Sequence, residues 1–486
     1  MIFHITGQNP TTSYREMFLY DNQANTLTVE RTGFVYKYFD AIEKPETRTP
    51  VVPFSKTTPL KKSRRIHKLK VQLGLSCNYS CDYCSQRFVE RPPETTKKDI
   101  DQFIRSLSNL DFNEGEGLKI EFWGGEPLVY WKTLNPLVEA LDEKFLKWKT
   151  KPRYSMITNG SILTEDMVSW LIHHRFSVAV SHDGPGQFVR GPDPFDDPEV
   201  KANILTLYRA LKPLGRFSFN SMLNQANYGR KEIREWFVNL TGDKDVPLGE
   251  GGVIDAYDEG GYENCLATKQ QHFEFRKKAF NDIHEANGDS GFGGINQKMN
   301  GFVTSLLSHS NADYLGQKCG MDQEDIISID LKGDVITCQN VSSKEVSKNG
   351  EDHLAGNIRN LDDVEITTST HWKNRPHCSD CPVLHLCQGS CMFLEGKYWD
   401  ISCANSYSDN VVLFSSVFES ITGLIPVFID APDLPDHRKD IWGNLLEHQE
   451  TKVKRVIPIS IVSPKAVVEG SSVYSRSKIE NSTVSL

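Results

Sequence analysis

Residues 68–84 read Lys-Leu-Lys-Val-Gln-Leu-Gly-Leu-Ser-Cys-Asn-Tyr-Ser-Cys-Asp-Tyr-Cys. The first half alternates, from Leu69 to Leu75, in the pattern of a β-strand. The second half then places three cysteines close together, Cys77, Cys81 and Cys84. Three thiolates leave a metal centre one ligand short, and an open coordination site is typical of a catalytic centre. We therefore expect a metal centre on the loop that leaves a strand, with a structural zinc site or buried thiols as the alternative.

Composition sets the broad class of protein. The chain has 486 residues, with 38% hydrophobic and 24% charged residues, which is typical of a globular protein of about two to four domains. Its net charge of −9 argues against nucleic-acid binding. The first ten residues lack the pattern of a secretory signal, and the most apolar stretch, 410–429, is interrupted by Glu419, Gly423 and Pro426. We expect a cytoplasmic protein without a membrane partner.

Eleven cysteines in a cytoplasmic chain are not expected to form a disulfide framework. After the first three, Cys265 stands alone. The remaining seven are concentrated towards the far end: Cys319, Cys338, Cys378, Cys381, Cys387, Cys391 and Cys403.

From Lys68 onward, strand patterns alternate with helical patterns, which predicts a parallel sheet. We expect an α/β fold in the form of a partial (β/α)6 barrel of the TIM type, with its site at the carboxyl ends of the strands. The predicted strands are 69–75, 119–123, 154–158, 177–181, 216–222 and one near 250–254. The predicted helices lie near 97–110, 132–148, 164–174, 198–212 and 230–240, and 269–285 is predicted to be a bridging helix.

The Cys-x3-Cys-x2-Cys spacing, with the aromatic Tyr83 before the last cysteine, resembles the signature of the radical S-adenosylmethionine (SAM) superfamily. The resemblance implies that Cys77, Cys81 and Cys84 hold a catalytic [4Fe–4S] cluster. The open iron would bind SAM. Reduction would then cleave SAM to methionine and a 5′-deoxyadenosyl radical, which abstracts a substrate hydrogen atom.

Three further segments resemble motifs of this superfamily. Trp123–Pro127 resembles the GGE motif, which implies that Gly124, Gly125 and Glu126 contact the amino group of SAM. Glycines allow close backbone approach, and a carboxylate is a natural acceptor for an ammonium group. Tyr154–Gly160 resembles the TNG segment of the same family.

The third segment, Val178–Pro185, resembles the SxDGP strand end. The resemblance implies that Ser181 and Asp183 face the methionyl and ribose parts of SAM. Arg190 would hold the carboxylate of SAM, although its spacing departs from the commoner pattern. The alternative for Arg190 is a surface guanidinium.

The seven later cysteines match the layout of the SPASM extension, which carries two auxiliary [4Fe–4S] clusters in relatives that modify peptides. The resemblance implies an outer cluster on Cys378, Cys381, Cys387 and Cys403. It implies an inner cluster on Cys319, Cys338 and Cys391. Cys265 could complete the inner cluster, or the site is open, or Cys265 is merely a small buried hydrophobic residue. A zinc ribbon is the alternative for the whole set.

One residue bears on the type of reaction. Sulfatase-maturing relatives carry an aspartate after the cysteine of the Gly-x4-Cys motif, whereas this chain has Gln339, an amide that cannot act as a base. We therefore expect a radical SAM oxidoreductase that modifies a ribosomally synthesised peptide, most simply by a cross-link. The alternatives are a formylglycine-forming protein oxidase and, in another class, a non-catalytic metal-binding module. The implied partners are a precursor peptide or protein and a low-potential electron donor of the flavodoxin or ferredoxin type.

The expected domains follow from these motifs. A basic run from Lys56 to Lys70 is expected to be a solvated linker or a surface that attracts an acidic leader peptide. The domains are 1–64, an N-terminal region with a peptide-docking hairpin; 65–265, the radical SAM core; 266–310, a bridging helix and linker; 311–410, the SPASM domain; and 411–486, a C-terminal helix and a disordered tail.

Overall fold

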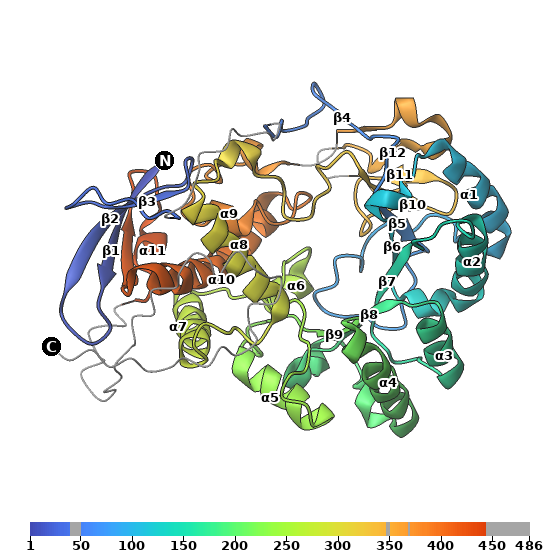
Figure 1. Cartoon of the computed structure of the whole chain (residues 1–486), viewed down its shortest axis with the longest axis horizontal. Coiled ribbons are helices and arrows are strands. Elements are labelled where there is room, and N and C mark those ends of the chain that lie inside the picture. Colours follow the sequence, from blue (N-terminus) through green and yellow to red (C-terminus); the bar gives the residue numbers. More distant parts are fainter. Residues whose placement is uncertain (39–49, 347–349, 368–369, 444–486) are drawn as a thin grey trace.

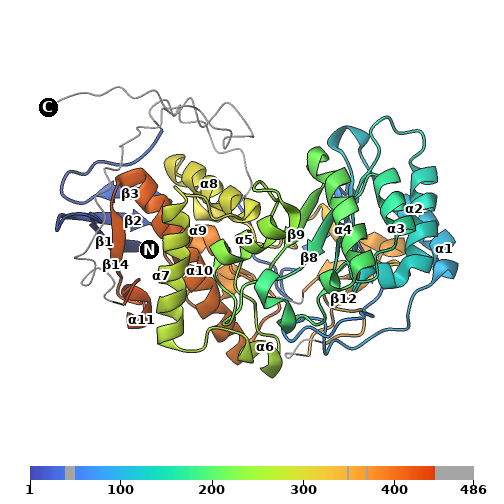
Figure 2. The same ribbon diagram turned by 90° about the horizontal axis from the view of Figure 1, so that it is seen from below.

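The computed structural model describes residues 1–38, 50–346, 350–367 and 370–443, so most of the predicted tail lies outside it. The molecule is elongated, with a curved sheet and its helices at one end and a smaller sheet beside long helices at the other (Figure 1). The same separation is visible from below (Figure 2).

Five consecutive strands form the parallel core of the larger sheet: β5 (Lys68–Gln72), β6 (Lys119–Trp123), β7 (Arg153–Thr158), β8 (Ser177–Ser181) and β9 (Phe217–Asn220). The helices between them lie along one face of the sheet (Figure 1): α1 (Ile100–Ser106), α2 (Trp131–Lys144), α3 (Glu165–His173) and α4 (Pro198–Leu211), with α5 (Arg230–Thr241) following β9. The predicted α/β partial barrel is confirmed.

The two faces of this sheet differ in chemistry. Leu69, Ile120 and Tyr154 stand side by side in register on the helix-covered face and are buried. The row next to them along the strands faces the barrel interior and is polar. Its members are Ser328, Lys70, Glu121, Ser155 and Ser177. The apolar face supplies the core, and the polar face lines the space in which chemistry can occur.

The sixth predicted strand is present only as isolated parallel bridges, from Leu248 to Phe219 and from Val253 to Leu223. The intervening sequence, Gly249-Glu250-Gly251-Gly252, explains the difference. Glycines have low strand propensity and offer no side chain to pack on neighbouring strands. The barrel wall is therefore irregular at this edge.

The other edge of the barrel sheet is extended by residues from the cysteine-rich part of the chain. β10 (Ile326–Asp330) pairs in parallel with β5, and β11 (Asp334–Ile336) and β12 (Leu354–Asn357) continue the sheet antiparallel. The order is β12-β11-β10-β5-β6-β7-β8-β9. The region predicted to be a separate SPASM domain thus shares a sheet with the core.

The smaller sheet joins the two ends of the described chain. Its order is β14-β1-β2-β3, and it consists of β1 (Ile2–Gln8), β2 (Arg15–Asp21), β3 (Thr26–Val29) and β14 (Ile425–Asp430). The predicted hairpin is therefore present as β2 and β3. This sheet packs on α10 (Gly396–Thr422) through aromatic pairs such as Phe18 with Phe418, 4.9 Å between ring centroids.

The remaining helices flank α10. The predicted bridging helix is present as α7 (Lys269–Glu285) and starts with a capping box between Thr268 and Gln271. The others are α6 (Glu259–Glu263), α8 (Gly293–Leu307), α9 (Leu384–Cys387) and α11 (Asp436–Lys439), and the two-residue strands β4 (Leu60–Lys61) and β13 (Glu365–Ile366) pair with each other. None of the helices in the described part of the chain is long and apolar enough to cross a bilayer.

Candidate active site

The three-cysteine loop follows β5 and presents its thiols at the carboxyl end of the barrel. Cys77 is exposed, while Cys81 and Cys84 are half-buried. The backbone N–H of Tyr79 donates to Cys77 Sγ at 3.3 Å, and that of Gln86 donates to Cys84 Sγ at 3.4 Å. Amide donors stabilise the charged form of a thiol. The loop therefore offers three sulfur ligands, two of them already stabilised by the backbone.

The GGE turn after β6 lies directly against the start of this loop. The N–H of Gly125 donates to Gly74 O at 3.1 Å, and that of Glu126 donates to Ser76 O at 3.0 Å. A Cβ atom on Gly125 would lie 2.4 Å from Ser76 O, and one on Gly124, whose φ is +156°, would lie 2.4 Å from Gly74 O. The two glycines are thus required for contact between two backbone segments of the site, in addition to any contact with a ligand.

The carboxylate of Glu126 is buried and bonded within the chain. Its oxygens accept from the Thr158 hydroxyl at 2.6 Å, from Asn159 N–H at 2.7 Å and from Leu128 N–H at 3.0 Å. Burial raises the pKa of Glu126, and these three donors oppose the rise. Glu126 therefore ties the GGE turn to the TNG turn after β7, and its contact with SAM stays a prediction.

The TNG turn is also hydrogen-bonded to the cysteine loop. Asn159 Nδ2 donates to Asn78 Oδ1 at 2.9 Å, and Asn78 Nδ2 donates to the Ser161 hydroxyl at 2.8 Å. Asn78 lies next to Cys77, so these two bonds fix the approach of the loop to the strand end. In the sequence, the only signal that points to Asn78 is its position between Cys77 and Cys81.

The loop after β8 completes the site with a charged pair. Asp183 is fully buried, accepts from Tyr83 Oη, and has Oδ1 2.9 Å from the Met222 N–H. Arg190 Nε lies 3.2 Å from the same Oδ1, and the Arg190 guanidinium lies over the Tyr83 ring at 5.5 Å. Burial lowers the pKa of Arg190, but Asp183, Tyr83 and Cys81 together outweigh this effect and the net shift is upward.

Arg190 is therefore not a surface residue, because only 10% of its side chain is exposed. Its charge also acts on the nearby thiols. Burial raises the pKa of Cys81 to about 12, and Arg190 opposes that rise. Ser181, at the end of β8, is buried beside this pair. The structure thus brings the predicted SAM-contacting residues of β6 and β8 to the same edge as the cysteine loop.

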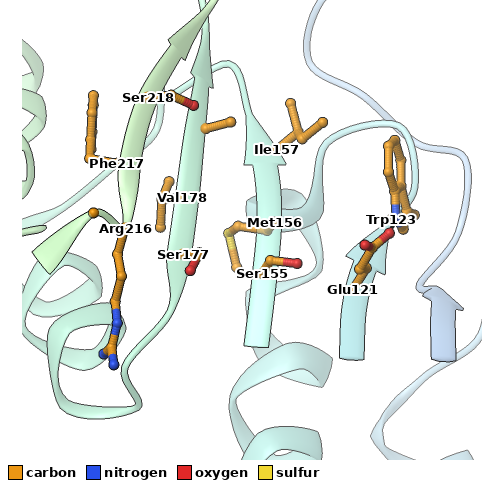
Figure 3. Close-up of a pocket in the computed structure, with 12 residues that line it drawn as sticks. Glu121, Trp123, Ser155, Met156, Ile157, Ser177, Val178, Arg216, Phe217 and Ser218 are labelled. Atoms are coloured by element: carbon orange, nitrogen blue, oxygen red, sulfur yellow. Dashed lines mark hydrogen bonds between the residues drawn. The ribbon is translucent and has the colours of Figure 1, made fainter. Parts of the chain in front are cut away.

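A cavity of about 290 Å³ lies within the barrel, against the inner side of strands β6 to β9 (Figure 3). Small side chains such as Ser155, Ser177 and Ser218 leave this space open, whereas a closed barrel fills it with bulky residues. Glu121 and Trp123 border one side of it, and Trp123 Nε1 donates to Glu121 Oε2 at 3.1 Å. The barrel interior can therefore receive part of a ligand.

Some of the seven later cysteines lie close enough to one another for their charges to interact. Burial raises the pKa of Cys378, and the other three thiols of the outer group raise it further. Burial likewise raises the pKa of Cys338 to about 12, with further contributions from Cys391 and Cys319. The charges that raise the pKa values of Cys378 and Cys338 come from other cysteines, and the assignment of the seven residues to two clusters stays a prediction. In the described part of the chain, no three Cys, His, Asp or Glu side chains are close enough to hold one metal ion.

Buried arginines test whether these groups suit an iron–sulfur cluster. Arg438 Nη2 donates to Cys403 Sγ at 3.2 Å, and Arg375 Nη2 donates to three backbone carbonyls, including Cys391 O at 3.0 Å. Within the described residues, the Nε donor of each of these arginines is buried without a hydrogen-bond partner. The sulfides of a cluster are acceptors that such donors can bind. The residues present therefore fit a cluster, and sequence reasoning had no signal for either arginine.

The inner cysteine group is attached to β5, the strand that leads to the first three cysteines. Gln339, next to Cys338, accepts from Lys70 Nζ at its Oε1 (3.1 Å) and from Gln72 Nε2 at its carbonyl (2.7 Å). Gln86 Nε2, close to Cys84, also points at the Gln339 carbonyl, at 3.4 Å. The first and inner groups therefore border one another across the end of β5.

Cys265 is placed elsewhere. Its side chain is fully buried in a small apolar cluster with Ile254 and Ala256, and its thiol lies 3.6 Å from Ile254 O. Burial raises the pKa of Cys265 to about 12, and Asp255 is the charge that adds to the rise. These surroundings are those of a small buried hydrophobic residue.

Comparisons with known proteins agree with this geometry. Residues 71–215 match the model of the Radical SAM superfamily. The radical SAM cyclopropyl synthase TigE of Paramaledivibacter caminithermalis is 23% identical over 384 residues, which are 70% of this chain and 72% of that protein. A cysteine-type anaerobic sulfatase-maturating enzyme of Clostridium perfringens (strain 13 / Type A) is 24% identical over 341 residues, 65% of this chain and 85% of that enzyme.

Among solved structures, native anSMEcpe with bound AdoMet and Cp18Cys peptide superposes with a TM-score of 0.53 at 20% identity, covering 74% of this chain and 98% of that one. This likeness supports the fold. The chain carries a radical SAM domain at residues 71–215 and is an enzyme, with SAM and a [4Fe–4S] cluster as its cofactors.

Proposed function

We propose that this chain is an oxidoreductase that removes hydrogen from a ribosomally synthesised peptide and joins two of its atoms in an oxidative cross-link. The observation that carries the proposal is the attachment of two cysteine groups to one strand. Gln86, beside the first group, and Gln72, on β5, both donate to the carbonyl of Gln339, beside the inner group. A substrate radical formed at the first group would lie near a second redox centre.

In this proposal, one set of residues binds the catalytic cluster and another set binds SAM. Cys77, Cys81 and Cys84 would hold the catalytic [4Fe–4S] cluster, and this cluster, when bound, would supply a 5′-deoxyadenosyl radical from SAM. Gly124, Gly125 and Glu126 shape the pocket for the amino group of SAM, Ser181 and Asp183 line its other side, and Arg190 binds the carboxylate.

The balance of the reaction requires an electron acceptor. A cross-link costs the peptide two hydrogen atoms: one leaves as a hydrogen atom to the deoxyadenosyl radical, and the other leaves as a proton and an electron. The auxiliary groups would hold two further clusters, an outer one on Cys378, Cys381, Cys387 and Cys403 and an inner one on Cys319, Cys338 and Cys391. These clusters would accept the electron. A flavodoxin or ferredoxin type of donor would supply the electron that starts each turnover.

Support for a peptide substrate comes from two directions. The comparisons include a cyclopropyl synthase and a sulfatase-maturating enzyme that align over 72% and 85% of their lengths. The cavity in the barrel, bordered by Ser155, Ser177 and Ser218, has a volume of about 290 Å³ and could receive a side chain.

The test is a mass spectrum of candidate peptides encoded beside the gene, co-expressed anaerobically with this chain. We expect a loss of two hydrogens and an internal segment that resists fragmentation. The Cys77→Ala/Cys81→Ala/Cys84→Ala variant is the control and should leave the peptide unchanged. Unchanged peptide with the wild-type chain, despite formation of 5′-deoxyadenosine, would refute the substrate class. Absence of SAM cleavage would favour a non-catalytic metal-binding module.

A formylglycine-forming oxidase is the second candidate, and Asp255 is the observation that favours it. Gln339 cannot act as a base and is held by Lys70. Asp255 lies at the irregular sixth barrel position, where burial raises its pKa and Lys318 opposes the rise, and its charge acts on Cys391. In this case the spectrum would show one cysteine or serine converted to an aldehyde, and Asp255→Asn would abolish the conversion.

A further inference from the structure

The small sheet formed by β1, β2, β3 and β14, here called the terminal sheet, lies beside the outer cysteine group. β14 leads into α11, and α10 carries Cys403, so the sheet and the cysteine are linked through one stretch of chain. In Figure 1 the terminal sheet, α10 and α11 lie together at the end of the molecule away from the barrel. Two polar side chains extend from this region to the outer group, Asn22 and Arg438.

Asn22 lies in the turn between β2 and β3 and is completely buried. Its Nδ2 donates to Ser379 O at 2.8 Å and to Cys381 O at 3.0 Å. In the other direction, the Asn22 carbonyl lies 2.8 Å from His385 Nε2. The hairpin turn is therefore bonded at three points to the loop that carries Cys378, Cys381 and Cys387.

The same turn is fixed on its far side. Asn25 accepts from the Tyr20 hydroxyl at 2.9 Å and donates to the Ser305 hydroxyl of α8 at 2.8 Å. Such a fully bonded polar turn has one arrangement, and it holds the cysteine loop in one position. Rigid support of this kind is what a cluster needs from the residues around its ligands.

Arg438 approaches the outer group from α11. Its Nη2 donates to Cys403 Sγ at 3.2 Å, and its guanidinium lies over the Tyr407 ring at 4.8 Å. The Tyr407 hydroxyl donates to the Arg438 carbonyl at 2.7 Å, which fixes the backbone of the short helix. The Nε donor is buried and has no hydrogen-bond partner within the described residues.

We propose that the terminal sheet completes the outer cysteine centre, in which Asn22 positions the ligand loop and Arg438 stabilises the reduced state through its hydrogen bond to the Cys403 sulfur. The inference rests on the proposed function, in which this group holds a cluster. Reduction adds negative charge to a cluster, and a nearby cation with N–H donors to sulfur favours that state. The outer cluster is thereby made a better electron acceptor than its thiolates alone would make it.

The test compares Arg438→Gln with Lys439→Gln, which removes the same charge from the same short helix. Lys439 pairs with Asp430, 2.9 Å from Nζ to Oδ1. Both variants are made in the Cys77→Ala/Cys81→Ala/Cys84→Ala background, so that a spectroscopic redox titration observes the auxiliary clusters alone. The Cys403→Ala variant identifies the signal of the outer cluster.

We expect Arg438→Gln to weaken the preference for the reduced outer cluster about tenfold, which corresponds to a fall of about 59 mV in its midpoint potential. Lys439→Gln should leave that potential unchanged. Arg438→Lys keeps the charge but loses the fork of donors, so its midpoint potential should lie between those of the two glutamine variants. An unchanged potential in Arg438→Gln, or an equal fall in both glutamine variants, would overturn the role of Arg438. Absence of a signal that depends on Cys403 would instead overturn the proposed function itself.

Asn22 is tested by the rate at which an added chelator removes iron. Asn22→Asp keeps the size of the side chain and removes the N–H donors, so we expect the outer irons to be lost about tenfold faster. Gln23→Ala, which removes a bond of 3.1 Å to Asn311 on the outside of the same turn, should keep the wild-type rate. Equal rates in Asn22→Asp and wild type would contradict the positioning role.

Discussion

The first cysteine group and the outer cysteine group are built in opposite ways. Cys77 is exposed at the end of the barrel, and its loop is held by the turns after three other strands. Cys378 is buried, and the outer group is covered by the terminal sheet and contacted by Arg438. A centre that must bind a second ligand needs an open side, whereas a centre that only exchanges electrons is best enclosed.

The largest effect should come from removing a thiol of the open group. Cys81→Ala should reduce formation of 5′-deoxyadenosine to background, because the catalytic cluster loses one of its three ligands. Chromatography of the reaction products measures this directly. Cys265→Ala is the matched control, because Cys265 lies in an apolar cluster, and it should keep full SAM cleavage. Loss of cleavage in both variants would make Cys265 part of a metal centre.

The next effect concerns the backbone contact that shapes the open group. In Gly125→Ala the new Cβ would lie 2.4 Å from Ser76 O, so one of the two segments must move. We expect a loss of about 2 kcal/mol in unfolding free energy and about a hundredfold loss of SAM turnover. Gly301→Ala on α8, where nothing lies within 4 Å, should be neutral or stabilising. Wild-type turnover in Gly125→Ala would show that the contact is not needed.

Arg190→Lys distinguishes a ligand contact from a purely structural ion pair. Lysine keeps the charge beside Asp183 but loses the planar fork that suits a carboxylate, so SAM affinity should fall about tenfold. Titration calorimetry of the cluster-loaded protein measures the dissociation constant. Arg209→Lys, on the exposed side of α4, provides the control. Unchanged affinity in Arg190→Lys would leave the arginine with a structural role alone.

The smallest expected effect is on the free energy of unfolding, and it depends on pH through His272, which contacts α10. Burial, with the charge of Arg276, lowers the pKa of His272 from 6.5 to about 4, and its Nδ1 lies 2.8 Å from the Ser408 hydroxyl. The unfolded chain therefore takes up a proton below pH 6.5 that the folded chain takes up only near pH 4. Stability from this group is present above pH 6.5 and is lost as the pH falls towards 4.

Anaerobic denaturation at pH 7 and pH 5 would measure this slope. His272→Gln should reduce the loss of unfolding free energy between the two pH values by about 1 kcal/mol, a figure discounted for partial exposure. His173→Gln, exposed on α3, should not change it. An identical slope in wild type and His272→Gln would remove His272 from the pH dependence.

The fold and the open group were largely predictable because both depend on local sequence. Alternation from Leu69 onward gave β5, and the motif turns fell at strand ends as expected. The predicted sixth strand is not formed as a continuous strand, because the glycines after Leu248 have no side chains to pack against neighbouring strands. The predicted hairpin formed, but nothing local to Asn22 reveals that it bonds to residues more than 350 positions away.

The basic run from Lys56 to Lys70 shows the same limit. It was expected to be a solvated linker or a surface for an acidic leader peptide. In the structure Lys62 is buried and donates to the carbonyls of Met321 and Gln323, and Arg64 pairs with Asp362 at 2.9 Å. The run instead binds residues from the cysteine-rich region, a partner that only the tertiary fold supplies.

The first cysteine group is proposed to cleave SAM, and the outer cysteine group is proposed to accept an electron. The most direct test of this central claim measures both 5′-deoxyadenosine and modified peptide in one variant of the outer group. In Cys381→Ala, supplied with SAM, reductant and a peptide that the wild-type chain modifies, we expect 5′-deoxyadenosine to form while the peptide stays unmodified. The catalytic cluster would be intact, and the acceptor for the second electron would be missing. A peptide modified as in the wild type, or a loss of 5′-deoxyadenosine as complete as in Cys81→Ala, would contradict the division of labour between the two groups.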